Sequence, residues 1–459
     1  MSDVILNSWD GPSTPVHALT EAGAAEALAS DAFAAGLART AEFKGKAGQA
    51  LLVPASDGAL SRVLFGLGDG ADPMVFRALP AKLPASGVYR LEATPAGFTP
   101  ERIALAFALG SYRFDRYKAA GAERPRLVTP GADLAEVIAI SHACALCRDM
   151  VNTPANDLGP RQIETIAREV AEQYAAQMTV VVGNDLLAEN YPAIHAVGRA
   201  AHPDRASRMI EISWGAPGNP LIALVGKGVV FDTGGLDIKP SAGMRQMKKD
   251  MGGAAHALAL GRMIMAANLP VRLAILLPVV ENAISGDAMR PGDILASRKG
   301  LSIEVGNTDA EGRLILADAL TRATELEPAL TIDLATLTGA ARAALGPQLP
   351  PFYTDDDELA GQIEAAAKAE SDPLWRMPLW KPYAEALDSD IADLKNDPDA
   401  WAQAGSVTAA LFLQRFAPPG PWVHLDIFAW NPKARAGWTS GGEAQTIRGL
   451  YRMIQGRFA

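Results

Sequence analysis

Hydrophobic residues follow two patterns along the chain. Up to about residue 125, an Ala-rich stretch with helical spacing (Leu19 to Thr40) accompanies short apolar runs at Ala50 to Pro54 and Arg62 to Gly66. From about residue 132, apolar runs of strand length alternate with helical stretches. The strands are expected over 221–230, 271–280, 329–334 and 422–427, and the helices over 242–268 and 313–325.

The second pattern predicts a parallel sheet. Runs of Val, Ile and Leu without polar alternation are typical of strands buried on both faces, and intervening helices are typical of α/β folds. The 459 residues also exceed the usual size of one hydrophobic core. We therefore expect an α/β protein with a small N-terminal α/β domain and a larger catalytic domain, whose mainly parallel sheet is flanked by helices. A turn-prone segment over 121–131 suggests domains at 1–130 and 131–459.

The composition limits the partners and the location. A net charge of −10 disfavours general attraction to nucleic acid or to an anionic membrane. The N-terminal residues have no basic stretch followed by an apolar run, and the apolar segment Leu221 to Phe231 is too short to span a bilayer. A cytoplasmic location is the default expectation, with no membrane partner.

Cysteine and histidine supply little obvious chemistry. Cys144 and Cys147 form a CxxC inside a predicted helix, and without a second pair or a thioredoxin-like setting we interpret them as buried helix thiols. The six histidines form no paired metal motif. His256 and His424 are expected to be packed or hydrogen-bonded, so carboxylates must hold any metal.

Two Gly-rich segments place ionisable groups at the ends of apolar strands. The first runs from Gly226 to Pro240 and precedes a helix predicted to hold Asp250; the second runs from Asn307 to Leu314. A phosphate-binding loop does not fit the first segment, because Leu221 occupies the first Gly position and Gly228 replaces the hydroxyl residue.

A metal site fits better. Four carboxylates gathered in one cleft would repel one another unless divalent cations neutralised them, and oxygen ligands suit Mg, Mn or Zn. Paired ions are a recurrent hydrolytic arrangement. Lys227 could join them only as a neutral amine. The alternative of exposed acids that aid solubility stays open at this point. The four carboxylates are Asp232, Asp250, Asp309 and Glu311.

These segments resemble the leucyl aminopeptidase family, the di-metal cytosol aminopeptidases. The stretch from Asn307 to Leu314 reproduces the family's signature without a mismatch. The resemblance covers about residues 145–430 and continues through 151–156, 247–254, 333–340 and 404–410. The positions that fall at the family's spacings are Lys227, Asp232, Lys239 and Asp250.

The resemblance implies a role for each of these residues. Asp232 and Glu311 would bridge two metal ions, Mn or Zn. Asp309 would complete one metal site, and Lys227 with Asp250 the other. Peptides would be the substrates and a homohexamer the assembly.

The resemblance also implies residues that act on the substrate. Lys239 would polarise the scissile carbonyl and stabilise the gem-diolate, and Arg313 would hold a bicarbonate that acts as general base. Met247 would line the pocket for the first side chain. The cleft would be lined by Thr336, the backbone of Leu337, and Gly339.

The sequence departs from the family in three places. After Ile427 the family usually has a small Ala-Gly turn, whereas this chain has Phe428-Ala429-Trp430-Asn431. The Gly-rich stretch 437–443 is longer and differently spaced, and Asp237 stands where many members carry Ser. The first two departures lie near the region that the family uses for its specificity pocket, so they put a preference for leucine in doubt.

Two other functions remain as alternatives. The first is a two-metal hydrolase of phosphoesters. A phosphate-binding cluster of Arg and Lys beyond Lys239 and Arg313 would favour it, and the sequence shows none. A non-enzymatic DNA-binding or scaffold role is disfavoured by the acidic charge and by the lack of a basic run in the N-terminal region.

Overall fold

The computed structural model describes residues 2–118, 121–398 and 403–458. The chain forms two compact units, one of residues 1–145 with 432–440 and the other of residues 146–431 with 441–459. Helix α4 (Leu134–Asn152) passes through the division between them. Among the described residues, no helix combines the length and the apolar character that a membrane span requires.

The first unit is built on a sheet with the strand order β1-β6-β5-β2-β4-β3. Its neighbours pair in parallel except β3 with β4, which are antiparallel. The expected helical stretch from Leu19 to Thr40 is two helices. The first ends at Ala29, and Asp31 caps the start of the second, because its side chain accepts a hydrogen bond from Ala34 N. The bounds are β1 Ile5–Leu6, β2 Thr14–Leu19, α1 Glu21–Ala29, α2 Ala32–Thr40, β3 Ala50–Pro54, β4 Leu60–Gly66, β5 Val88–Leu91, α3 Pro100–Gly110 and β6 Arg126–Val128.

The second unit is built on a larger mixed sheet in the order β16-β15-β18-β14-β9-β11-β8-β7, with β10 also on β11. The central pairs of β9 with β11 and β14, and of β14 with β18, are parallel, whereas β8 and β7 add antiparallel strands at one edge. The expected α/β class is therefore confirmed. The strands are β7 Gln177–Val182, β8 Arg208–Trp214, β9 Leu221–Gly226, β10 Gly228–Asp232, β11 Arg272–Asn282, β14 Leu330–Ala335, β15 Pro351–Tyr353, β16 Trp375–Arg376 and β18 Trp422–Asp426.

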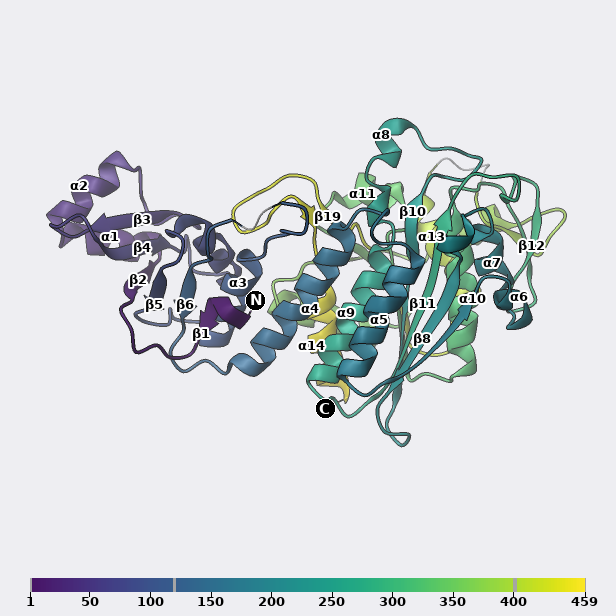
Figure 1. The fold of residues 1–459 in the computed structure, drawn as a ribbon, viewed down its shortest axis with the longest axis horizontal. Helices are drawn as coiled ribbons and strands as arrows, with labels where there is room; N and C mark the ends of the chain where they lie inside the picture. Colours follow the sequence, from purple (N-terminus) through teal and green to yellow (C-terminus); the bar gives the residue numbers. More distant parts are fainter. Residues whose placement is uncertain (1, 119–120, 399–402, 459) are drawn as a thin grey trace. The chain divides into compact units, whose positions relative to one another are not determined.

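Helices cover both faces of this sheet (Figure 1). Helix α9 packs against β9 and β14 and contacts α14, and α10 packs on β9 and β11 and contacts α7 and α13. Helix α9 is apolar nearly all round and buried along most of its length, as expected for a helix inside a large domain. The bounds are α5 Pro160–Gln173, α7 Pro192–Gly198, α9 Gly252–Ala266, α10 Glu311–Glu325, α11 Gly339–Leu345, α12 Asp357–Ala369, α13 Gly405–Gln414 and α14 Ile447–Phe458.

Two predicted elements are interrupted where the chemistry lies. The expected strand over 221–230 is β9 and β10, which pair with β11 in the same register on either side of Lys227. The expected helix over 242–268 is broken into α8 (Ser241–Met244), the 3₁₀ turn η4 (Met247–Lys249) and α9. Asp250 was predicted on a helix and instead lies between η4 and α9, because Gly252 and Gly253 begin the longer helix only after it.

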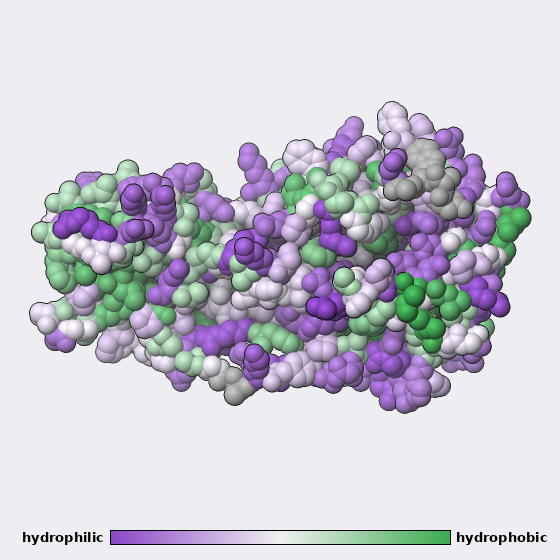
Figure 2. Space-filling view, turned by 90° about the horizontal axis from the view of Figure 1, so that it is seen from above, coloured by the Kyte–Doolittle hydropathy of each residue, from purple (hydrophilic) through white to green (hydrophobic). Residues whose placement is uncertain are grey.

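Polar and apolar residues are interspersed over the face drawn in Figure 2. Some large apolar side chains are exposed, including Leu236 and Ile238 in the turn after β10. Exposed apolar residues of this kind are ordinary on protein surfaces.

Candidate metal centre

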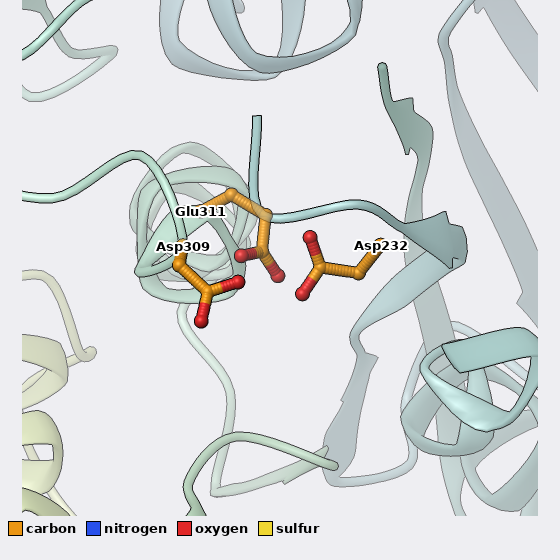
Figure 3. A group of neighbouring side chains, drawn as sticks. All are labelled: Asp232, Asp309 and Glu311. Carbon is orange, nitrogen blue, oxygen red and sulfur yellow. The ribbon is translucent and has the colours of Figure 1, made fainter. Parts of the chain in front are cut away.

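Three acidic side chains converge where β10 and the turn before α10 meet. Asp232 is the last residue of β10, Asp309 lies in the turn, and Glu311 is the first residue of α10. Each offers an oxygen within 4.8 Å of the others, and the carboxylates face one another (Figure 3). Two buried carboxylates and one half-buried carboxylate at this spacing form a site suited to a divalent cation.

Two lysines and a fourth carboxylate complete the cluster. Lys227 Nζ lies 2.7 Å from Asp250 Oδ2 and 2.9 Å from Glu311 Oε1. Lys239 Nζ lies 2.8 Å from Asp232 Oδ2 and also pairs with Asp309 Oδ1. The four predicted carboxylates and both predicted lysines therefore share one site, with Lys227 at the Asp250 end and Lys239 at the Asp309 end.

The cluster perturbs its own protonation. Burial raises the pKa of Glu311 to about 8 and that of Asp309 to about 6, and the Asp232 carboxylate adds to both shifts. Burial alone would lower the pKa of Lys227, but the carboxylates of Asp250 and Glu311 outweigh it and raise that pKa above its usual value. The cluster thus holds more acidic groups than its lysines neutralise, which is the condition that bound cations relieve.

One buried oxygen of the cluster has no partner among the described residues. Glu311 Oε2 accepts no hydrogen bond from them, whereas Asp250 Oδ2 and Asp309 Oδ1 are paired with lysine nitrogens. Buried polar atoms are normally satisfied, so an unpartnered carboxylate oxygen among other carboxylates fits a group that supplies positive charge. The donor set of the chain fits divalent metal ions.

Glycines let the elements that carry these ligands approach closely. A Cβ on Gly312 would lie 2.6 Å from Lys227 Cε, and a Cβ on Gly253 would lie 2.0 Å from the carbonyl oxygen of Leu334. Both distances are far below van der Waals contact. The first turns of α9 and α10 therefore need glycine to lie beside Lys227 and β14.

Two asparagines that sequence reasoning did not single out hold the acidic residues in place. Asn282, at the end of β11, donates from Nδ2 to Asp232 Oδ1 at 2.8 Å. Asn396 follows β17 (Leu394–Lys395); its side chain accepts from Gly306 N and donates to the carbonyl oxygens of Asn307 and Ala310. A polar amide directly after an apolar strand was the available signal for Asn282, whereas nothing local marked Asn396.

Arg313 and Asp237 are also fixed to this region. Arg313 is buried and donates from Nη1 to Asn396 O at 2.6 Å, while its Nε has no hydrogen-bond partner. Asp237, which departs from the family pattern, accepts hydrogen bonds from the backbone and hydroxyl of Thr308. Its carboxylate therefore anchors the turn after β10 to the turn that carries Asp309.

Two of the predicted substrate-cleft residues, Thr336 and Met247, contact Asp250, and the other two follow β14. Thr336 is buried and donates from Oγ1 to Asp250 Oδ1 at 2.9 Å. Leu337 N donates to Asp426 Oδ1 at 3.0 Å, which orients the backbone after β14. Met247 is half-buried in η4, and Gly339 is exposed at the start of α11.

The structure adds two cations beside Asp250 that sequence reasoning did not find. Lys249 is 2% exposed, with Nζ 4.0 Å from Asp250 Oδ1. Its Nζ lies 5.3 Å from the ring centre of Phe428, and the Arg342 guanidinium lies 4.6 Å from the same ring. Burial lowers the pKa of Lys249 to about 8. Lys249 is adjacent to Asp250 in the chain, whereas Arg342 and Phe428 come from distant segments that packing brings to it.

The histidines and cysteines have other partners. His256 Nδ1 lies 2.6 Å from Gly252 O, and its Nε2 accepts from Gln445 N at 3.0 Å. His424 Nδ1 lies 2.5 Å from Asp333 Oδ1. Cys144 and Cys147 are buried in α4, form no disulfide, and Cys147 Sγ lies 3.3 Å from His256 Nδ1. The expectation of packed or hydrogen-bonded side chains is confirmed for both histidines.

Comparison with known families decides the class of protein. The model of the cytosol aminopeptidase family catalytic domain matches residues 145–451, and that of the M17 aminopeptidase N-terminal domain matches residues 14–130. The chain belongs to the cytosol aminopeptidase family. It is thus a peptidase of the M17 type, as its resemblance to the leucyl aminopeptidases implied.

Individual known proteins are similar to this chain in sequence and structure. A probable cytosol aminopeptidase of Syntrophotalea carbinolica is 42% identical, over 76% of this chain and 73% of the relative. The crystal structure of cytosol aminopeptidase from Coxiella burnetii is 42% identical, with a TM-score of 0.94 over 100% of each chain. The bottromycin maturation enzyme BotP in complex with Mn is 34% identical, with a TM-score of 0.85 over 92% of this chain and 96% of BotP.

Proposed function

We propose that this chain removes the N-terminal residue from peptides with water activated by two divalent metal ions, Mn or Zn. The observation that carries the proposal is the convergence of four carboxylates with two lysines at one end of the second unit's sheet. Membership of the cytosol aminopeptidase family and the Mn complex of BotP support it.

The proposed ligands follow from the two ends of the cluster. Asp232 and Glu311 lie between the lysines and would be shared by both ions; Asp309 would complete one site, and Lys227 with Asp250 the other. When bound, the ions would supply Lewis acidity and lower the pKa of water toward neutrality. Lys227 carries a proton in the ion pairs described above, so its service as a ligand would require proton release.

Lys239 and Arg313 would act on the reacting groups. The Lys239 ammonium would donate to the carbonyl oxygen of the scissile bond and stabilise the negative charge that develops there. Arg313 would hold a bicarbonate as general base: its planar guanidinium suits a two-point hold on such an anion, and its buried Nε has no partner.

The substrate would lie along the segments beside Asp250. The exposed Gly339 and the backbone near Leu337 would border the cleft. Thr336 would hold Asp250 in place through its hydrogen bond. Met247 would face the first side chain of the peptide. A free α-amine at the metal site would explain removal of one residue at a time, because a blocked or internal amide nitrogen is a poor ligand.

Substitution of single ligands tests the proposal. The variants Glu311→Gln and Asp250→Asn should lose hydrolysis of a leucine anilide assayed with Mn or Zn, and calorimetry should show weakened metal binding. Glu325→Gln is the matched control, because Glu325 ends the same helix in ion pairs with Arg298 and Arg322. Full turnover by either ligand variant would contradict the proposal.

The same assay separates the alternatives. A peptide and a phosphoester tested side by side with added Mn should show cleavage of the peptide alone; the reverse result would favour a phosphoesterase. Gel-shift binding of DNA at physiological salt would revive the non-enzymatic role. The homohexamer stays a prediction of the family resemblance, and light scattering after size exclusion would test it. The cytoplasmic location stays the default expectation from the sequence.

A further inference from the structure

Two cations lie against one aromatic ring next to the proposed metal ligands. We call Lys249, Arg342 and Phe428 the Phe428 cluster. Lys249 Nζ lies 5.3 Å from the ring centre, and the Arg342 guanidinium lies 4.6 Å from it. Within the described part of the chain, the one carboxylate within 4 Å of either cation is Asp250, whose Oδ1 is 4.0 Å from Lys249 Nζ. The carboxylates of Asp250 and Asp426 act on both cations from the protein side, and neither cation forms a close, short ion pair with them.

The position of the cluster follows from the two lysines of the metal centre. Lys239 lies at the Asp309 end, so the scissile carbonyl that it contacts lies there too. The carbonyl carbon, the terminal amine and the first side chain share one Cα, and bonds of about 1.5 Å keep these groups within a few ångströms of one another. The amine then faces the opposite end, where Lys227 contacts Asp250, and the first side chain starts beside it. Lys249 is the residue adjacent to Asp250.

The cluster is held rigidly in place. Gln445 Oε1 accepts hydrogen bonds from the backbone of Phe428 at 3.1 Å and of Ala429 at 2.8 Å. Arg342 donates from Nη1 to Thr338 O at 3.1 Å, and its Nη2 lies 3.6 Å from the position of a Cβ on Gly339. Gly339 is exposed and Arg342 is half-buried, so the Arg342 side chain is partly open to solvent beside Gly339. Fixed cations recognise an anion without an ordering cost.

We propose that the Phe428 cluster selects the charge of the first residue, so that peptides beginning with Asp or Glu are cleaved in preference to those beginning with Lys or Arg. This specificity rests on the proposed aminopeptidase function. A carboxylate on the first side chain gains from the buried Lys249 and the half-buried Arg342, whereas an ammonium or guanidinium is repelled by both.

Amides of Glu, Gln and Lys with one fluorogenic leaving group test this selection. Gln matches Glu in shape without its charge, so the three substrates separate charge from size. The wild-type ratio of kcat/KM for Glu over Lys should be about tenfold or more at neutral pH. Arg342→Gln and Lys249→Met should each lower the ratio about tenfold, and Arg342→Lys should keep most of it. Because the two kcat/KM values in each ratio come from the same variant, a general loss of activity does not change the ratio.

Controls and a binding measurement complete the test. Lys381→Met removes a positive charge from a side chain that is 77% exposed and paired with Asp355, and should leave the ratio unchanged. Calorimetry should show that L-glutamate binds the metal-loaded protein more tightly than L-lysine. Arg342→Gln should reduce the difference between these two affinities. The half-buried Arg342 keeps the test decisive if the buried Lys249 variant does not fold.

The outcomes distinguish this inference from the proposed function. Two results overturn the role of the Phe428 cluster and leave the aminopeptidase proposal intact. One is cleavage of the Gln and Lys amides with a Glu-to-Lys ratio of kcat/KM below one. The other is a ratio that neither Arg342→Gln nor Lys249→Met changes. Failure to cleave any amide with Mn or Zn overturns the proposed function itself.

Discussion

Asn282 donates hydrogen bonds from Nδ2 to Asp232 Oδ1 at 2.8 Å and to Thr308 O at 3.1 Å. One buried amide thus ties the end of β10 to the turn that carries Asp309. It also occupies one oxygen of Asp232 and leaves Oδ2 directed to Lys239. Groups that orient metal ligands in this way influence metal affinity without touching the metal.

Replacement of Asn282 by Ala should weaken the centre. Without the amide, Asp232 Oδ1 keeps the donor Gly234 N and loses the side-chain donor, so metal affinity and kcat/KM should fall by about 10-fold. Calorimetry with Mn and a peptide assay would measure both. Asn156→Ala, at an exposed position, is the control. Unchanged metal affinity in the Asn282 variant would show that Asp232 is oriented by other contacts.

Loss of the Asn396 side chain should destabilise the acidic turn. The buried amide accepts from Gly306 N at 2.8 Å and donates to Asn307 O at 2.8 Å and Ala310 O at 3.2 Å. Asn396→Ala should reduce the free energy of unfolding by about 2–4 kcal/mol, measured in urea. Asn396→Asp keeps the acceptor and loses the donors, so an intermediate stability is expected. Equal stabilities of wild type and Asn396→Ala would refute the role of these bonds.

Removal of metal should lower thermal stability. Cations that bind the folded cluster and not the unfolded chain stabilise the fold, by about 2.7 kcal/mol at a concentration one hundred times Kd. A chelator should therefore lower Tm and added Mn should restore it, as followed by scanning calorimetry. Glu311→Gln should reduce the response, because it removes a carboxylate at the centre of the cluster. If neither the chelator nor added Mn changed Tm, the result would count against a metal at this site.

His256 should make stability depend on pH. Burial lowers its pKa to about 4 in the folded protein, against an ordinary value of 6.5, and Nε2 must stay unprotonated to accept from Gln445 N. The unfolded chain therefore binds a proton as the pH falls through 6.5, while the folded protein does not until about 4. The stabilisation is complete above 6.5 and is lost toward pH 4, by at most about 3 kcal/mol.

Urea unfolding from pH 7.5 to 4.5 checks the contribution of His256. The stability difference between wild type and His256→Gln should narrow as the pH falls. His202→Gln, which alters a side chain 70% exposed, is the control variant. A constant gap between wild type and His256→Gln would mean that the ring is protonated alike in both states.

The positions of most strands and helices follow from the sequence. Apolar runs at 271–280 and 422–427 became β11 and β18 within about two residues, because strands buried on both faces are continuous in Val, Ile and Leu. Helix α10 was expected from Arg313 and begins two residues earlier, at Glu311. The carboxylates at strand ends could be expected to meet, since parallel strands end at one edge of a sheet.

Packing alone decided the rest. β9 and β10 pair with β11 in one register on either side of Lys227, so no local pattern reveals the break there. Asp250 lies outside the predicted helix because glycines let α9 begin after it, packed against β14. Asn396 and the Phe428 cluster join segments distant in the chain. Hydrophobic periodicity and glycine-rich turns are local properties, so they determined the class of fold and the acidic residues of the proposed metal centre. Contacts between distant side chains depend on how the elements pack, so only the tertiary structure placed the groups that orient those acidic residues and the cations beside them.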